Sequence, residues 1–170
     1  MTTAFRTARL VAEPLALPAH EDELAALHAD ASVMATMGGR TATPAESRAW
    51  IERNLRHGEE PGLGIFVFRE RESGRFVGRG ALRRIEIGGG EEVEVGYAVA
   101  AGLWGRGYAT EMAGGLVAHA EGAGLRNLVA YTEPGNAASR RVMEKVGFRY
   151  ERAVEHHGRA QVLHRRRSEP

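Results

Sequence analysis

The chain has 170 residues, of which 43% are hydrophobic and 26% charged, a composition typical of one globular domain rather than a disordered segment. It contains no cysteine, so disulfides, thiolate nucleophiles and cysteine-based zinc sites are excluded. The formal net charge of +1 gives no reason to expect nucleic acid as the main partner. No apolar run reaches the roughly 18 residues of a membrane span, and Met1–Leu10 lacks the apolar core of a secretory signal. We therefore expect one cytoplasmic domain over residues 1–170.

The first third of the chain predicts one strand and two helices. Thr7–Leu17 has the pattern of a strand and is bounded by prolines. Glu21–Met37 carries apolar residues at helical spacing and ends at two glycines, which predicts a helix. A second helix should occupy about residues 44–57, because Thr43 can cap it, the following proline suits the first helical position, and Glu46 completes a capping box.

Strand patterns dominate the middle of the chain, and helices alternate with strands after it. Three strands are predicted at Gly64–Arg69, Arg75–Ile87 and Glu92–Ala100. Glycine-containing turns separate them, which predicts an antiparallel meander. A helix, a strand, a helix and two final strands should follow, near Gly107–Ala123, Asn127–Thr132, Ala137–Val146, Phe148–Glu155 and Gln161–Arg166. This order predicts a mixed α/β (α+β) fold whose central, mostly antiparallel sheet of about six or seven strands is flanked by about four helices.

A glycine-rich turn leads from the third strand of the meander into the next helix, with the sequence Trp104-Gly105-Arg106-Gly107-Tyr108-Ala109-Thr110. The first turn of a helix has unpaired N–H groups and partial positive charge, so it can bind a phosphate or pyrophosphate. Gly105 and Gly107 would let the backbone approach an anion closely. The spacing differs from that of nucleotide P-loops and of the dinucleotide fingerprint. The residues alone also allow a simple tight turn before an amphipathic helix whose core stripe begins at Tyr108.

This turn and a second block of residues resemble the GCN5-related N-acetyltransferase (GNAT) superfamily. The family's pyrophosphate loop reads Gln/Arg-x-x-Gly-x-Gly/Ala, and Trp104 here replaces the usual Gln or Arg, as in the branch of ribosomal-protein N-terminal acetyltransferases (RimJ/RimL type). Asn136–Phe148 is similar to that branch's Asn-x-x-Ser-x-x-Val-x-Glu-Lys-x-Gly-Phe block. Thr7–Leu10 resembles its opening strand, and Val33–Gly39 resembles the end of its first helix. The resemblance covers nearly the whole chain, and it implies a GNAT fold and transfer of an acetyl group from acetyl-CoA to an amine.

The resemblance implies an acetyl-CoA site made of the loop residues 104–110 with Val99, Asn136 and Ser139. The backbone N–H of Val99 would polarise the acetyl carbonyl, which is the role of an oxyanion hole. Asn136 would contact the pantetheine arm and could cap the following helix as well. The Ser139 hydroxyl would lie near the thioester sulfur and donate to the leaving thiolate. From the residues alone, Asn136 could be only a cap and Ser139 only a solvent-facing or backbone-bonded serine.

Glu94 is the first candidate for a base, which is useful because amines are mostly protonated at neutral pH. In a strand, Glu94 shares one face with Gly96 and Ala98, whose small side chains leave room for a substrate. Related enzymes place a glutamate in the equivalent Glu-Ile-Gly-Tyr segment. The alternative is a solvated carboxylate on an exposed sheet face.

His156 and His157 are the next candidates for the base, because the unperturbed pKa of histidine near 6.5 suits that task. Together with His164 they could suggest a metal cluster, but no carboxylate pattern completes such a site, and we expect no metal. Tyr97 and Tyr131 could act as acids, although both are expected in the core or in a pocket wall.

The acceptor amine could belong to a protein N-terminus, an amino acid, a polyamine or an aminoglycoside-like compound. Met34–Arg40, the second helix and Glu155–Arg159 should set the choice, and Arg40 or Arg159 could hold an acidic acceptor. We expect a monomer or a homodimer in which the amine attacks directly within a ternary complex. Two non-enzymatic alternatives remain: an acyl-CoA sensor on the same fold, and a protein–protein module whose glycine-rich turn is only a turn.

Overall fold

The computed structural model describes residues 2–168. Its strands are β1 (Phe5–Arg6), β2 (Leu10–Pro14), β3 (Gly64–Glu70), β4 (Phe76–Ile87), β5 (Gly90–Val99), β6 (Leu128–Thr132), β7 (Arg149–His156) and β8 (Arg159–Arg166). Its helices are α1 (Glu21–Ala29), α2 (Ala31–Met34), α3 (Pro44–Leu55), α4 (Tyr108–Gly122) and α5 (Ala137–Lys145), with short 3₁₀ turns η1 (Arg56–Glu59) and η2 (Ala101–Leu103). In this part of the chain, no helix is both long and apolar enough to cross a membrane.

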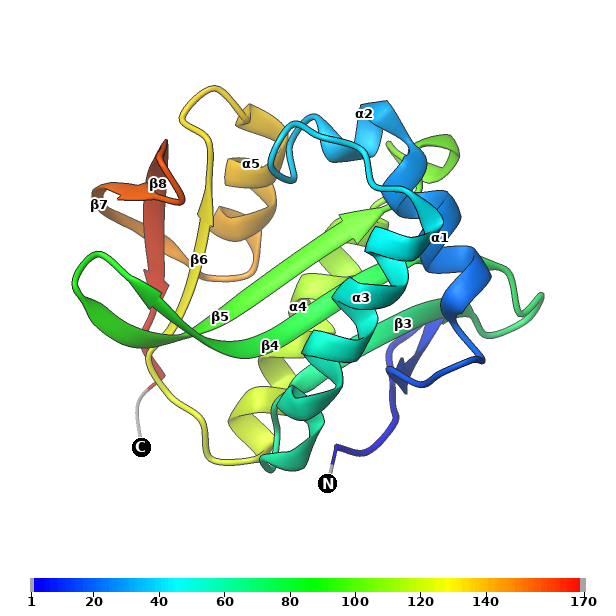
Figure 1. The fold of residues 1–170 in the computed structure, drawn as a ribbon. Coiled ribbons are helices and arrows are strands. Elements are labelled where there is room, and N and C mark those ends of the chain that lie inside the picture. Colours follow the sequence, from blue (N-terminus) through cyan, green and yellow to red (C-terminus); the bar gives the residue numbers. More distant parts are fainter. Residues whose placement is uncertain (1, 169–170) are drawn as a thin grey trace.

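The strands form one eight-stranded sheet in the order β1-β2-β3-β4-β5-β6-β8-β7 (Figure 1). Neighbouring strands are antiparallel except β5 and β6, which are parallel. The mixed α/β fold and the mostly antiparallel sheet are therefore confirmed. The described residues contain eight strands and five α-helices rather than six or seven strands and four helices, because a short edge strand precedes β2 and the first predicted helix is divided.

Helices cover both faces of the sheet, with α1, α2 and α3 on one face and α4 and α5 on the other (Figure 1). The alternation of side chains along β5 divides its residues between two cores. The core under α4 and α5 contains Val93, Val95 and Val99, with Tyr97 packed against it. The core under α1 and α3 contains Ala98. The predicted division of β5 into two faces is confirmed.

The predicted helix Glu21–Met37 is wrong in two respects, because it is interrupted at Asp30 and its second part ends at Met34. The backbone of Asp30 is extended (φ −78°, ψ 111°), and its carboxylate accepts hydrogen bonds from the N–H groups of Ser32 at 2.8 Å and Val33 at 3.4 Å. An aspartate that satisfies free N–H groups in this way begins a new helix. The result is the separate helix α2, which directs the following loop over the sheet.

The N-terminal segment is also less regular than predicted. Of Thr7–Leu17, only Leu10–Pro14 forms a strand paired with β3. A turn precedes it, in which the Thr7 N–H donates to the Leu10 carbonyl at 2.9 Å. The Thr7 hydroxyl bonds the carboxylate of Glu111 on α4 at 2.6 Å, so a tertiary contact holds this turn.

Helix α3 begins as its sequence predicts. The Thr43 hydroxyl accepts from the Glu46 N–H at 3.2 Å, and the Glu46 carboxylate accepts from the Thr43 N–H at 2.8 Å. This is the reciprocal capping box. The helix ends at Leu55, and the turn η1 takes up the remaining residues of the predicted span.

Candidate active site

The two central strands β5 and β6 separate at the middle of the sheet. Their parallel pairing ends where Glu94 lies opposite Val129; β5 then follows β4 while β6 runs in a different direction (Figure 1). At the end of β5, the Ala100 N–H donates to the Val77 carbonyl at 2.9 Å. Successive N–H groups of a strand point to opposite edges. The N–H of Val99 therefore points to the edge that β6 has left.

The loop that joins β5 to α4 carries a run of free backbone donors. Gly105 and Gly107 both have positive φ, 76° and 78°, and Gly107 is the N-cap of α4. The first helical bond runs from the Glu111 N–H to the Gly107 carbonyl at 3.1 Å. Within residues 2–168, the successive N–H groups from Gly105 to Thr110 have no protein acceptor. Such a helix start fits a phosphate or pyrophosphate, so the residues present suit the diphosphate of CoA.

Trp104, the residue that departs from the family motif, ties the loop to β5. Its indole N–H donates to the Val99 carbonyl at 2.8 Å. The carbonyl and the N–H of one strand residue point to the same edge, so this bond independently places both polar groups of Val99 away from β4. Trp104 satisfies the carbonyl and leaves the N–H for a ligand. Its side chain remains 52% exposed.

Arg9, which the sequence did not single out, holds the loop from the turn before β2. Its guanidinium carbon lies 4.4 Å from the centroid of the Tyr108 ring. Its Nη1 donates to the Arg106 carbonyl at 3.0 Å, and its Nε bonds the Glu111 carboxylate at 2.7 Å. These contacts fix the loop and put a half-exposed cation beside its free N–H groups. Arg9 lies in the Thr7–Leu10 segment that resembles the opening strand of the family. Nothing in that segment predicts a contact between Arg9 and a loop about a hundred residues away.

The start of α5 brings together two hydroxyl groups. Asn136 Oδ1 accepts from the Ser139 N–H at 3.1 Å, so the predicted cap is confirmed. The Ser139 hydroxyl lies 3.0 Å from the Tyr97 hydroxyl on β5. Burial raises the pKa of Tyr97 to about 12, although the Ser139 contact opposes the shift. Tyr97 is therefore protonated at neutral pH, and its position is two residues, about 7 Å along the strand, from Val99.

Glu94 lies on the opposite face of β5 and is buried, with 7% of its surface exposed. Its Oε2 is 2.5 Å from Nε of Arg83, and Arg83 Nη1 also contacts Asn54 Oδ1 of α3 at 3.4 Å. The charge of Glu94 raises the pKa of Arg83 above its ordinary value, against the effect of burial. Glu94 is thus a buried ion-pair partner where β5 and β6 part, and the alternative of a solvated surface carboxylate is wrong. Its role as base stays a prediction.

The three histidines near the C-terminus fall into two places. His156 and His157 lie at the β7–β8 turn with ring centroids 4.0 Å apart, and His156 also meets the edge of Tyr131 at 4.9 Å. Burial and then the charge of His157 lower the pKa of His156. His164 is buried elsewhere, against Tyr150 at 5.8 Å. In residues 2–168, no group of three or more His, Asp or Glu side chains is placed to bind a metal.

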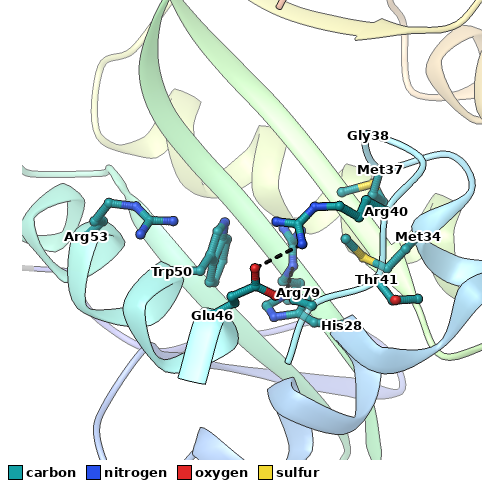
Figure 2. A pocket seen from close by; sticks show the side chains of 11 residues that line it. His28, Met34, Met37, Gly38, Arg40, Thr41, Glu46, Trp50, Arg53 and Arg79 are labelled. Carbon is teal, nitrogen blue, oxygen red and sulfur yellow. Dashed lines mark hydrogen bonds and ion pairs between the residues drawn. The ribbon is translucent and has the colours of Figure 1, made fainter. Parts of the chain in front are cut away.

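A pocket of about 300 Å³ lies on the face covered by α1 and α3 (Figure 2). Helix α3 supplies one wall and the loop after α2 supplies the other, and its lining residues are His28, Met34, Met37, Gly38, Arg40, Thr41, Ala42, Glu46, Trp50, Arg53 and Arg79. The pocket thus includes Met34, Met37, Gly38 and Arg40 of the predicted Met34–Arg40 segment and part of the second predicted helix. Arg40 bonds Glu46 at 2.9 Å across the two walls (Figure 2). Arg159 is not in the lining; it lies against Gly39 and pairs with Glu133.

Comparison with known proteins places this arrangement in a family. The profile of the acetyltransferase (GNAT) domain matches residues 9–149, and the chain belongs to the GNAT acetyltransferase family. The resemblance of the sequence motifs to that family is therefore confirmed.

Solved structures show the same fold over nearly the whole chain. An acetyltransferase from Agrobacterium tumefaciens str. C58 is 25% identical, with a TM-score of 0.83 and coverage of 99% of this chain and 96% of that chain. A protein described as a GnaT-family acetyltransferase from Bordetella pertussis is 26% identical, with a TM-score of 0.82 and coverage of 97% and 99%. RimL, the ribosomal L7/L12 alpha-N-protein acetyltransferase in complex with coenzyme A, is 16% identical, with a TM-score of 0.80 and coverage of 97% and 98%. This chain therefore has the fold of a member of the RimJ/RimL-type branch.

Proposed function

We propose that this protein is an N-acetyltransferase that moves the acetyl group of acetyl-CoA onto a primary amine by direct attack in a ternary complex. The proposal is supported by three features at the end of β5. The Val99 N–H points to the open edge of this strand, the N–H groups of Gly105 to Thr110 in the loop that follows β5 have no acceptor within residues 2–168, and the Tyr97 hydroxyl on β5 meets the Ser139 hydroxyl. The loop would hold the diphosphate, and Asn136 would contact the pantetheine arm.

The residues along this edge supply the groups that aminolysis of a thioester needs. The Val99 N–H would polarise the acetyl carbonyl. The Ser139 hydroxyl, backed by Tyr97, would give a proton to the leaving thiolate as the C–N bond forms and the C–S bond breaks. Glu94 would take the proton that the amine loses. Because Glu94 lies about 16 Å along β5 from Val99, we infer that this proton travels through water.

The experiment that tests the proposal is a calorimetric titration with acetyl-CoA, with CoA and NADH as comparison ligands, followed by an amine screen. Release of CoA can be followed with a thiol reagent without background, because the chain has no cysteine. We expect saturable binding of both CoA ligands, no binding of NADH, and turnover with some amines. Absence of any CoA binding would remove the proposal. Binding without turnover across the amine panel would favour the acyl-CoA sensor.

A further inference from the structure

Arg79 is a buried arginine on β4 that lines the pocket between α3 and the loop after α2. Only 7% of its surface is exposed, and its guanidinium carbon lies 4.4 Å from the centroid of the Trp50 ring. Its Nε donates to Nε2 of His28 at 3.1 Å. An aromatic face and a hydrogen bond therefore hold the guanidinium in one position.

Within residues 2–168, Arg79 forms no ion pair, although the carboxylate of Glu94 lies near enough to act on its charge. None of the ion pairs formed among residues 2–168 includes it, and in the same residues its two terminal amino groups have no hydrogen-bond acceptor. Burial and the nearby charge of Arg83 lower the pKa of Arg79 to about 10, against the opposing charge of Glu94, and Arg79 is still cationic at neutral pH. A buried charge without an ion-pair partner destabilises a fold. The contacts with Trp50 and His28 hold the guanidinium in place but do not neutralise it.

His28 orients Arg79 but does not neutralise it. Because Nε2 accepts from Arg79, the ring proton is on Nδ1 and donates to the Ser47 hydroxyl at 2.8 Å. Burial, followed by the charge of Arg79, lowers the pKa of His28 to about 4. The neutral chain from Ser47 through His28 occupies Nε of Arg79 and leaves both Nη groups for a ligand. Two parallel N–H donors of this kind match the two oxygens of a carboxylate.

The rest of the pocket suits a small anionic molecule. Its lining holds three arginines and one glutamate, and that glutamate, Glu46, already pairs with Arg40 at the rim. Trp50, Met34 and Met37 supply apolar walls (Figure 2). A cavity of about 300 Å³ is at the small end of pockets that enclose a small ligand.

The pocket adjoins the place where acetyl transfer is proposed. In the β4–β5 ladder, Arg79 lies opposite Ala98, the residue next to Val99. Directly opposite Cα atoms in such a ladder are about 5 Å apart. Along the same face, Ala81 and Gly96 also lie opposite each other, and the carboxylate of Glu94 lies beside Gly96. An anionic group at Arg79 and an amine at the thioester can thus belong to one small molecule.

We propose that the acceptor is a small amine of amino-acid size that carries a carboxylate, and that Arg79 binds this carboxylate with both Nη groups while Trp50 and His28 hold the guanidinium. This inference rests on the proposed acetyl transfer, because the ligand is an acceptor only if that reaction occurs. The binding of the ligand can be measured without turnover.

The test is calorimetry on the full chain saturated with CoA, titrated with the standard amino acids, β-alanine and γ-aminobutyrate, each beside its carboxamide. We expect at least one acid to bind about 100-fold more tightly than its amide, because the amide leaves the buried charge unpaired. Arg79→Gln should remove that preference and leave CoA affinity unchanged. Arg84→Gln, on the same strand but paired with Glu60 and Glu91 outside the pocket, should keep it. If Arg79→Gln does not fold, the comparison of acids with amides on the unaltered protein still tests the inference.

Equal binding of acids and amides, or no binding of any acid, would overturn the inference, as would binding only of peptides with a free N-terminus. CoA release from acetyl-CoA, measured in parallel, separates the two proposals. Turnover of amines without any carboxylate preference would reject the Arg79 assignment and keep the acetyltransferase. Arg79-dependent acid binding without turnover of any bound amine would keep the assignment and reject the enzyme.

Discussion

Trp104 and Asn136 each satisfy a backbone group that the fold leaves open, and both shape the edge on which acetyl-CoA is proposed to bind. The Trp104 indole takes the Val99 carbonyl, and the Asn136 amide oxygen takes the Ser139 N–H. A buried polar backbone group without a partner costs free energy, so these bonds have a structural reason. They leave the Val99 N–H and the Ser139 hydroxyl out of these two bonds.

We predict that Ser139→Ala lowers kcat by about 100-fold, the usual effect of losing a positioned proton donor. The dissociation constant of acetyl-CoA should be unchanged, because the Asn136 cap uses the Ser139 backbone and not its hydroxyl. Stopped-flow turnover and calorimetry measure the two quantities. Ser32→Ala, at an exposed position of α2 whose hydroxyl has no hydrogen bond within residues 2–168, is the matched control and should behave as the parent protein. An unchanged kcat in Ser139→Ala would remove the hydroxyl from the mechanism.

Between elements, the divergence of β5 and β6 determines where chemistry can occur. A strand inside a sheet has its N–H groups paired on both edges, and only the part of β5 beyond Glu94 has lost its β6 neighbour. The start of α4 lies just beyond that free edge and adds its own unpaired N–H groups. An extended ligand can therefore contact backbone donors from two elements in succession.

For the start of α4, we predict that Gly107→Val abolishes measurable acetyl-CoA binding. Gly107 has φ 78°, and a branched side chain there would cover the N–H groups at the start of α4. The matched control is Gly124→Val just after α4, where φ is 82° and a Cβ meets no atom within 4 Å. Both variants should lose about 1–2 kcal/mol of stability from the left-handed backbone, measured by urea unfolding. Equal loss of acetyl-CoA affinity in both would mean that strain, and not the loop surface, is responsible.

For the whole molecule, the buried polar groups between the sheet and the α1–α3 layer tie stability to pH. His28 joins β4 to α3 through its bonds to Arg79 and Ser47, and its ring meets the Trp50 edge at 5.0 Å. It can accept from Arg79 only while its Nε2 is unprotonated. Protonation would place two adjacent cations in a buried layer.

We predict a loss of stability on acidification that depends on His28. Its pKa is about 4 in the folded chain against 6.5 for an ordinary histidine, so the unfolded chain binds the proton first as the pH falls. The free energy of unfolding should therefore be highest above pH 6.5 and fall by about 3 kcal/mol on its account down to pH 4. Urea unfolding across this range measures the slope. His28→Gln should reduce the slope of the unfolding free energy against pH. Other histidines with lowered pKa, such as His119, should account for the slope that remains. Equal slopes in the parent protein and in His28→Gln would contradict the role of His28.

Most helices and strands could be predicted from the sequence, and so could the family from which the acetyl-CoA site is proposed. The capping box at Thr43, the glycines before α4 and the Asn136 cap are local, because each depends on residues a few positions apart. The loop and the Asn136–Phe148 block also carried the family resemblance. Local pattern failed at Asp30, where an aspartate that begins α2 interrupted an otherwise helical spacing.

Contacts between residues far apart in the chain could not be predicted. Nothing in the local pattern shows that Arg79 is buried and forms no ion pair within residues 2–168, that Glu94 pairs with Arg83, or that Arg9 contacts the loop before α4. Charge and periodicity are properties of one segment, whereas burial, ion pairing and the free edge of β5 depend on which strand and helix lie next to it. For that reason the resemblance to the GNAT family came from the sequence, whereas the proposal for the acceptor depends on the packing of α1 and α3 on the sheet.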